Sequence, residues 1–360
     1  KMIVQKLKMY NFRCFSSFEI VFSNKINILL GRNATGKTSI LEAINYLALT
    51  KSFRTNDESQ LVKEQQNEMS VIGEIIKDKS TCFCKIIRQV KGKQVSKDGY
   101  KYSKISEYLG EILVVSFTNS DILNLLGTIR ERRKIIEPII CQISKFYTDE
   151  CNSYKKLLNE RNALLKRLIF ENNDKLMNLL KIIDLQIVDC AKNIIFERDN
   201  FIQKVNKKIK QYHLQISENK EILEIKYAPS VSSEKFLERL NSCLEEDLKR
   251  GSTSYGPHKD DYVFIINNKN ITLYGSQGQQ RSSLVSTKLA FVEILKEEKG
   301  EYPVLLLDDV LSDLDKHRQN SIFKLLNENV QTLVSSSTLS ELDDSIKKKA
   351  KIITLEREMK

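Results

Sequence analysis

The sequence predicts an α/β fold in which both ends of the chain form one head and a helical arm is inserted between them. Short apolar runs of the kind found in strands occur on both sides of the middle of the chain. The stretch between Pro138 and Pro229 contains neither glycine nor proline, and its apolar residues recur at steps of three and four, as in a helix. We therefore assign 1–140 plus 250–360 to the head and 141–249 to the arm.

The strand candidates of the head are short runs rich in Val, Ile, Leu and Phe. Those before the arm are 18–22, 26–30, 71–76, 82–87 and 112–116, and those after it are 262–266, 303–307 and 331–334. The run at 262–266 leads into Asn267 and Asn268, so we expect a hairpin there.

The arm is predicted to consist of two long antiparallel helices, 144–171 and 174–212. The polar cluster at 171–174 separates them, and its Asn and Asp residues are suited to cap the second helix. At ~1.5 Å per residue, such an arm is about 40 to 55 Å long.

Composition favours a protein that meets a polyanion in the cytoplasm. The chain has 360 residues with 58 Lys and Arg against 47 Asp and Glu, a net charge of +11. A nucleic acid is the first candidate partner, and a Lys-rich solvated surface is the alternative. The seven cysteines form no CxxC pair, which favours a reducing compartment over a disulfide framework or a zinc site. No apolar run reaches the ~18 residues that a membrane span needs, so we expect no membrane partner.

A phosphate-binding loop is predicted between the strand at 26–30 and an apolar helix at 39–49. The loop fits the pattern G-x-x-x-x-G-K-[ST] with Gly31, Arg32, Asn33, Ala34, Thr35, Gly36, Lys37 and Thr38. In such a loop the backbone N–H groups surround phosphate oxygens, and the helix adds its positive end. Lys37 is expected to contact the β- and γ-phosphates of ATP, and Thr38 is expected to be a ligand of Mg²⁺.

A second acidic element follows the apolar run 304–307, which ends in Asp308 and Asp309. We expect Asp308 to join the Mg²⁺ shell and Asp309 to orient or deprotonate the attacking water. These two motifs alone leave kinases, GTPases, helicases and transporters open.

The segment Ser276, Gln277, Gly278 and Gln279 narrows the choice. It opens an apolar helix, and it resembles the signature motif of ABC-type ATPases. In that superfamily the motif binds the γ-phosphate held by the P-loop of the other subunit, so the resemblance implies a homodimer formed on ATP binding. Gln277 stands where a second glycine is common. This form of the motif is similar to that of the chromosome-maintenance branch.

Six segments together resemble the bacterial RecF recombination-mediator family, in that family's order and over nearly the whole chain. They are 36–44, 51–55, 161–166, 256–261, 276–281 and 307–315. The short arm also distinguishes the chain from SMC-type proteins with long coiled coils.

The resemblance implies an ABC-type P-loop ATPase head and a cytoplasmic, ATP-gated protein of DNA repair. Its expected activity is a weak DNA-dependent ATPase, with ATP and Mg²⁺ as cofactors. It is expected to bind DNA at gaps or at junctions of single and double strands, in gap repair, replication restart and the SOS response. RecR, with RecO, is the implied protein partner. Residues 312–315 would face the partner subunit across the ATP.

Several positions depart from the family's pattern. Ala34 replaces a usual glycine, Phe53 replaces a histidine, and Glu137 with Pro138 replaces an Asp-Arg pair. The region 117–121, where the switch loop is expected, lacks its glutamine. The segment 334–338 lacks the switch histidine, so Ser or Thr would have to contact the γ-phosphate and hydrolysis would be slow. For His258 we expect a turn rather than a metal site.

The candidate DNA-binding residues are basic residues near the P-loop, before the arm and along it. They are Arg54, Arg130, Arg132, Arg133, Lys134, Lys155, Lys156, Lys166 and Arg167. The alternative is a helix surface with ion pairs between residues four positions apart. We expect 347–349 to be a solvated face.

Two other functions compete with this interpretation. One is the nucleotide-binding subunit of an ABC transporter, which the long arm and the net charge of +11 disfavour. The other is a monomeric P-loop kinase, which leaves the segment 276–279 without a role. Titration with DNA in the presence and absence of ATP separates these classes.

Overall fold

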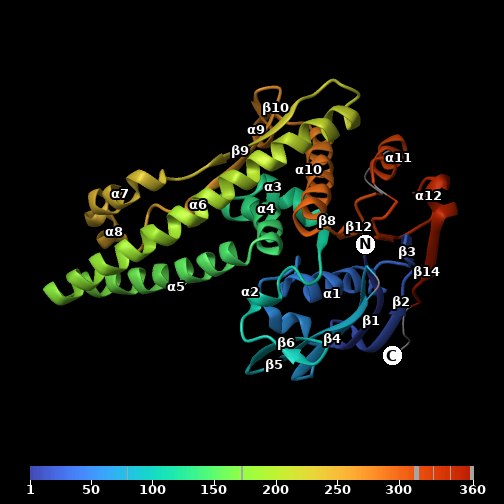
Figure 1. The fold of residues 1–360 in the computed structure, drawn as a ribbon, viewed down its shortest axis with the longest axis horizontal. Helices are drawn as coiled ribbons and strands as arrows, with labels where there is room; N and C mark the ends of the chain where they lie inside the picture. The colour runs from blue at the N-terminus through green and yellow to red at the C-terminus, as the bar shows by residue number, and fades with distance from the viewer. Residues whose placement is uncertain (79, 172, 312–315, 327, 341, 357–360) are drawn as a thin grey trace.

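The computed structural model describes residues 1–360 except 79, 172, 312–315, 327, 341 and 357–360. Figure 1 shows a head that contains both chain ends and an arm of long helices that projects from it. Within the described residues the strands form three sheets. The predicted α/β head with an inserted helical arm is therefore confirmed.

A five-stranded parallel sheet forms the centre of the head, in the order β14-β3-β13-β12-β8. Its strands are β3 (Ile26–Leu30), β8 (Val114–Thr118), β12 (Val304–Asp308), β13 (Thr332–Ser336) and β14 (Ala350–Thr354). The residues of β12 and β13 are all buried, as expected for parallel strands covered on both faces. Because the strands run the same way, the segments that follow them meet at one edge of the sheet.

A six-stranded antiparallel sheet lies beside it, in the order β2-β1-β4-β5-β6-β7. Its strands are β1 (Met2–Phe12), β2 (Phe15–Val21), β4 (Glu68–Lys77), β5 (Ser80–Gln89), β6 (Gly92–Lys97) and β7 (Tyr100–Lys101). Helix α1 (Lys37–Leu49) contacts strands of both sheets, and its residues 39–48 are buried. The helix is therefore covered on all sides, and its buried Glu42 accepts hydrogen bonds from Arg13 and Ser52.

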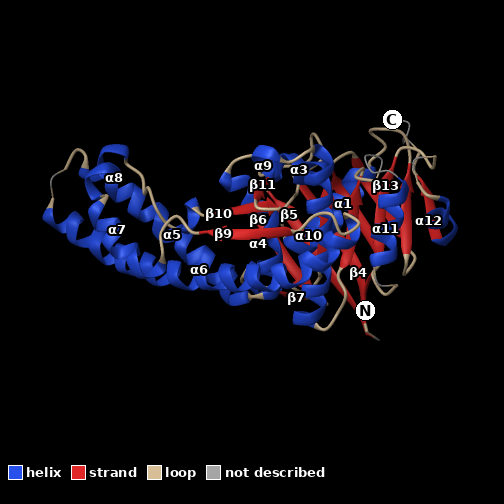
Figure 2. Cartoon of the chain, turned by 90° about the horizontal axis from the view of Figure 1, so that it is seen from above, coloured by secondary structure: helices blue, strands red, loops and turns tan. Residues whose placement is uncertain are grey.

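The arm consists mainly of α5 (Lys145–Leu168) and α6 (Asp174–Ile216), which confirms the two predicted long helices. Asn173 caps α6 by accepting from the Lys175 backbone N–H, as the polar cluster predicts. The 43 residues of α6 make a helix of about 65 Å. Two short helices, α7 (Phe236–Ser242) and α8 (Leu244–Arg250), lie beside the outer part of the arm (Figure 2).

A three-stranded antiparallel sheet joins the arm to the head, with β9 (Leu223–Ala228), β10 (Asp261–Ile266) and β11 (Lys269–Asn270). The predicted hairpin is confirmed. Asn267 and Asn268 between β10 and β11 both have left-handed backbones, with φ of 46° and 66°. Asn accepts this conformation more readily than most residues.

The remaining elements complete the connections. They are α2 (Ile105–Tyr108), α3 (Asn119–Leu126), α4 (Ile129–Ile143), α9 (Ile271–Tyr274), α10 (Gln277–Lys299), α11 (Lys316–Leu325), α12 (Asp344–Lys349) and the 3-10 turns 58–61, 233–235 and 257–259. In the described part of the chain, no helix has the length and apolar character to cross a bilayer.

The predicted domain limits cross packed structure. Helix α4 continues through residue 141, and β9 pairs with β10 across residue 250. The division at these two positions therefore stays a prediction.

A buried ionic cluster around Asp260 fastens the arm to the head. The Asp260 side chain is fully buried and accepts from Arg198 of α6 at 3.0 Å, from the Ser230 N–H at 2.8 Å and from the Tyr227 hydroxyl. Arg198 also donates to the Pro257 carbonyl at 2.8 Å and to Glu137 of α4. The segment 256–261 is thus a junction where α4, α6 and β9 meet.

His258 belongs to the same junction and holds α5. Its Nε2 lies 3.1 Å from the Thr253 carbonyl, which can only accept, so Nε2 carries the proton. Its Nδ1 then accepts from the Tyr154 hydroxyl at 2.7 Å. Burial lowers the pKa of His258 to about 4, which keeps the ring neutral near pH 7. The expectation that His258 belongs to a turn is confirmed.

We expect the exchange of Arg198 for Met to lower the free energy of unfolding by about 3–5 kcal/mol, because Asp260 stays buried without its charged partner. Urea denaturation followed by circular dichroism measures the change. Lys204→Met is the matched control, since Lys204 lies on the same helix but forms an exposed ion pair with Glu298. Its effect should stay below ~1 kcal/mol. Equal losses for the two variants would contradict a special role of the buried cluster.

Candidate functional site

The predicted phosphate-binding loop connects β3 to α1 at the carboxyl edge of the parallel sheet. Ala34 and Gly36 have left-handed backbones, with φ of 68° and 95°. A Cβ atom on Gly36 would lie 2.3 Å from the ring of Phe15, so only glycine fits there. The Thr35 hydroxyl donates to the Arg32 carbonyl at 2.9 Å and closes the loop.

Lys37 lies across the mouth of this loop. Its Nζ donates to the carbonyls of Gly31 at 2.6 Å and Arg32 at 3.1 Å, and the residue is 4% exposed. The described residues give this ammonium carbonyl partners and no carboxylate within ion-pair distance. A buried cation paired only with carbonyl dipoles is suited to bind an anion such as a phosphate.

Thr38 and Asp308 meet beside the loop, although 270 positions separate them. The Thr38 hydroxyl donates to the Asp308 carboxylate at 2.9 Å, and the Ser335 hydroxyl lies 2.8 Å from the same oxygen. Thr38 follows β3, Asp308 ends β12 and Ser335 lies on β13, which are neighbours in the parallel sheet. Hydroxyl and carboxylate oxygens are the ligands that Mg²⁺ prefers, so this set fits the ion.

The two aspartates of the site differ in environment. Asp308 is buried, which raises the pKa of its carboxyl, while hydrogen bonds from Ser335 and Thr38 oppose that rise. Asp309 is less buried and has a left-handed backbone with φ of 53°. Its N–H donates to Ser335 Oγ at 2.9 Å. The backbone of Asp309 is thus fixed at the place where the sequence predicts a hydrolytic carboxylate.

Ser335 is a member of this site that the sequence located only to the segment 334–338. Its hydroxyl bridges the two aspartates, whereas the Ser336 hydroxyl donates to the Thr338 carbonyl at 2.8 Å. The signal in the sequence was a serine near the end of a buried strand that neighbours β12.

The segment 276–279 forms the N-terminus of α10. Ser276 caps the helix by accepting from the Gln279 N–H at 3.2 Å, and Gln279 accepts from the Ser276 N–H at 2.9 Å. This reciprocal arrangement is a capping box. Ser276 and Gln277 are exposed, so the positive end of α10 faces solvent. The predicted small-residue turn before a helix is confirmed, and its role in nucleotide binding stays a prediction.

In the region 117–121, Asp121 makes internal contacts. Its carboxylate accepts from the Thr118 N–H at 2.8 Å and from Lys288 of α10 at 2.8 Å. Both charged side chains are largely buried. This ion pair connects the first turn of α3, which follows β8, to the helix that Ser276 caps.

Arg54 lies close to a buried carboxylate of the P-loop helix. The fully buried Glu42 of α1 accepts from Arg13 and from the Ser52 hydroxyl, and its carboxylate lies 3.5 Å from Arg54. Arg54 remains 45% exposed, so it can still meet an external phosphate.

The structure divides the remaining basic candidates into two groups. Arg132 donates to both carboxylate oxygens of Asp261, at 2.7 and 2.8 Å, and Arg133 is buried with one hydrogen bond to the Asp260 carbonyl at 2.9 Å. Because their guanidinium groups are engaged inside the protein, we correct their assignment and keep both out of the DNA surface. The exposed candidates are Arg130, Lys134, Lys155, Lys156, Lys166 and Arg167.

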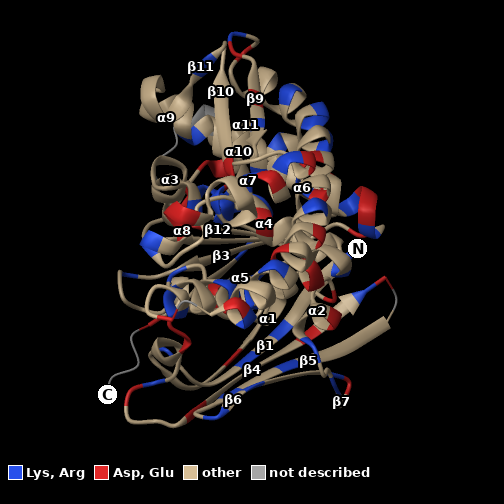
Figure 3. Ribbon diagram, turned by 90° about the vertical axis from the view of Figure 1, so that its left-hand side faces the viewer, with Lys and Arg blue, Asp and Glu red and all other residues tan. Residues whose placement is uncertain are grey.

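Basic and acidic residues are interspersed on the helices of the arm in the end-on view (Figure 3). Lys156 lies 4.0 Å from Glu160, and Arg167 lies 3.4 Å from Glu171. The arm therefore presents separate cations between acidic neighbours.

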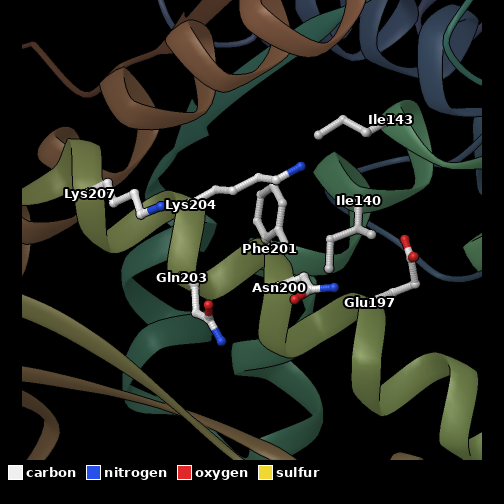
Figure 4. Close-up of a pocket in the computed structure, with 8 residues that line it drawn as sticks. All are labelled: Ile140, Ile143, Glu197, Asn200, Phe201, Gln203, Lys204 and Lys207. Atoms are coloured by element: carbon white, nitrogen blue, oxygen red, sulfur yellow. The ribbon is translucent and has the colours of Figure 1, made fainter.

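A cavity of about 240 Å³ lies apart from the predicted site, between α4 and α6 (Figure 4). The residues that line it are Ile140, Ile143, Glu197, Asn200, Phe201, Gln203, Lys204 and Lys207. The set contains none of the predicted nucleotide-binding residues.

The predicted partner-facing loop 312–315 falls outside the described residues.

Comparison with known proteins assigns the chain to a family. A family model described as an AAA domain matches residues 6–249. The DNA replication and repair protein RecF of Pediococcus pentosaceus is 36% identical over 350 residues, covering 94% of this chain and 93% of the relative. RecF of Lactococcus lactis subsp. lactis is 37% identical over 341 residues, covering 95% and 94%.

Solved structures give the same result. The recombination mediator protein RecF-ATP of the RecFOR pathway superposes with a TM-score of 0.87 at 33% identity, covering 95% of this chain and 94% of that one. The Smc head domain of Pyrococcus furiosus, at 17% identity and a TM-score of 0.53, shares the fold. The head is thus an ABC/SMC-type P-loop ATPase fold.

We expect the exchange of Ala34 for Gly to raise the free energy of unfolding by about 0.5–1 kcal/mol. A left-handed backbone costs a residue with a Cβ about 1–2 kcal/mol, and the greater entropy of glycine in the unfolded chain offsets only part of that gain. Thermal and urea denaturation measure the difference. Ala163→Gly, at an exposed interior position of α5, is the control and should instead destabilise by ~1 kcal/mol. Destabilisation by both exchanges would show that Ala34 carries no backbone strain.

Proposed function

Because the chain belongs to the RecF family of DNA replication and repair proteins, we propose that it is an ATP-dependent DNA-binding recombination mediator. It acts in gap repair by homologous recombination, in replication restart and in the SOS response. ATP binding joins two chains around DNA, and slow hydrolysis releases them. The protein works in the cytoplasm with RecR and RecO, at gaps or junctions of single and double strands.

The observation that carries this proposal is that one chain has two groups suited to bind a phosphate. One is the P-loop with the buried Lys37, and the other is the exposed N-terminus of α10 at Ser276. In an ABC-type fold these two sites hold the same nucleotide from different subunits. A single chain therefore has half of each of two sites, and dimerisation completes both.

The side chains divide the work on the nucleotide. Lys37 exchanges its carbonyl partners for the β- and γ-phosphates, and Thr38 with Asp308 holds Mg²⁺. When bound, Mg²⁺ neutralises phosphate charge. Asp309 orients or deprotonates the attacking water, and Ser335 keeps the two aspartates in register. Ser276, Gln277, Gly278 and Gln279 of the second chain contact the γ-phosphate through the hydroxyl and the helix N-terminus.

The DNA surface is assigned to Arg54, Arg130, Lys155 and Lys156. These residues are exposed, and they lie near the P-loop, before the arm and on it. Each contributes a cation to the phosphate backbone rather than a reading of base sequence. The head of 1–140 plus 250–360 carries the ATP sites, and the arm of 141–249 extends the surface that DNA meets.

Two variants separate nucleotide binding from dimerisation. Lys37→Ala should weaken binding of a fluorescent ATP analogue at least ~100-fold, because it removes the charge that faces the phosphates. Ser276→Arg should leave binding to the monomer unchanged and abolish the ATP-dependent dimer in sedimentation velocity. A Ser276→Arg protein that still dimerises with ATP would remove the second anion site from the proposal.

Asp309→Asn should bind ATP and slow the dissociation of the dimer.

Binding of DNA should depend on both ATP and salt. The slope of log K against log salt is negative. The double variant Lys155→Gln with Lys156→Gln should make it shallower by about 2, since each phosphate contact contributes about −0.9. Fluorescence anisotropy with gapped DNA measures this slope. Lys220→Gln is the control, because Lys220 forms an ion pair with Glu218 at 2.9 Å in the turn after α6 and is not one of the proposed DNA residues. A DNA-binding affinity that changes with neither ATP nor salt would contradict the proposal.

A further inference from the structure

The side chain of Gln279 is fixed from two directions. Its Oε1 accepts from the Ser276 N–H at 2.9 Å, and its Nε2 donates to Glu221 Oε1 at 2.8 Å. A carboxylate can only accept, so Glu221 determines which way the amide of Gln279 faces. That orientation places the amide oxygen on the N-cap and completes the capping box at Ser276.

Glu221 is itself held by a buried histidine of the arm. Its second oxygen lies 3.2 Å from Nε2 of His213, a fully buried residue in the last turn of α6. His213 Nδ1 lies 3.0 Å from the Ser286 hydroxyl of α10. Ser276, Gln279, Glu221, His213 and Ser286 thus form a continuous set of contacts between the first turns of α10 and the end of α6.

The turn that carries Glu221 is anchored on both sides. The Glu221 N–H donates to the Ser217 hydroxyl at 3.2 Å, and the next residue, Ile222, donates to Asn267 Oδ1 at 2.9 Å. Asn267 belongs to the turn between β10 and β11. The carboxylate therefore projects from a fixed backbone rather than from a free loop.

The first half of α10 depends on such external contacts. Its hydroxyls at Ser283, Ser286 and Thr287 donate to carbonyls four residues earlier, at 2.7, 2.8 and 2.7 Å. Bonds of this kind compete with the helix ladder and weaken it slightly. Gly278 in the first turn adds backbone entropy. A helix with this composition gains little from intrinsic propensity, so the contact from Glu221 has a large effect on its beginning.

We propose that Glu221 is a positioning residue for the segment 276–279, and that dimerisation on ATP depends on it although it is not expected to touch the nucleotide. The inference rests on the proposed function in one respect, namely that ATP binding forms a dimer. Its structural part, the orientation of Gln279 by Glu221, is independent of that function. Because His213 lies in the last turn of α6, the same contact makes the position of Ser276 sensitive to the base of the arm.

A swap of the two side chains tests the orientation directly. Glu221→Ala alone removes the acceptor of the Gln279 amide and the contact to His213, so the orientation of Gln279 is no longer fixed. Gln279→Glu alone sets two carboxylates against each other. In the double variant Glu221→Gln with Gln279→Glu, the carboxylate at 279 accepts from the Ser276 N–H and from the amide N–H at 221. The amide oxygen at 221 then faces His213 Nε2, as a Glu221 oxygen does in the wild-type chain. Every hydrogen bond and the net charge are restored.

Two measurements follow the swap. Hydrogen exchange of the ATP-free chain should show about tenfold faster exchange at 277–281 in each single variant and wild-type exchange in the double variant. Sedimentation velocity with ATP should show dimers weakened about tenfold in the single variants, a change of ~1.4 kcal/mol, and restored to within about threefold in the swap. Binding of the ATP analogue to the monomer should stay unchanged.

Glu298→Gln is the matched control, because Glu298 pairs with Lys204 between the same two helices but in the last turn of α10. It should change neither exchange at 277–281 nor dimerisation. Wild-type exchange in Glu221→Ala would overturn the inference, as would undiminished dimerisation of that variant. Restored exchange without restored dimerisation would also overturn it, since Gln279 would then act on the nucleotide directly. If the wild-type chain forms no dimer with ATP, the proposed function fails, and the exchange data alone decide the role of Glu221.

Discussion

The contact of Asp308 with Thr38 and Ser335 is the interaction on which the organisation of the head depends. It joins residues from the two ends of the sequence, and the chain must pass through the entire arm before the contact can form. Parallel pairing of β3, β13 and β12 brings the three residues to one edge of the sheet. Folding of the head around the long insertion thus creates the candidate metal site, and neither end of the chain contains it alone.

A second constraint is the ionic junction between arm and head. Apolar packing would hold α6 against α4 without fixing its rotation, whereas Arg198 must meet Asp260, Glu137 and the Pro257 carbonyl together. Buried ion pairs are costly to desolvate, so they contribute more to a defined geometry than to net stability. The arm therefore leaves the head in one direction, and its base at His213 lies in a fixed position relative to Ser276.

The sequence predicted those parts of the protein that depend on local pattern. The breaker-free stretch and its helical period gave α5 and α6 to within a few residues, and the pattern of Gly31 to Thr38 gave the P-loop between a strand and a helix. It could not show which basic residues are already paired. Arg132 and Arg133 are residues of a type common in DNA-binding surfaces. Their carboxylate and carbonyl partners at 260–261, however, lie more than 120 positions later in the sequence. It also missed β1, and it missed Glu221, because a single glutamate after a long helix carries no signal until Gln279 lies beside it.

The pairing of β9 with β10 determines how the arm can be shortened. Although the arm is an insertion, its returning segment supplies the outer strand beside β10. Removal of 141–249 as a block would leave β10 with an unpaired edge, and bare edges associate with other chains. It would also remove Arg198 and bury Asp260 without its cation. Trimming from the tip, where α5 ends and α6 begins, preserves both the strand and the ion pair. The insertion is accordingly indispensable at its base and expendable only at its far end.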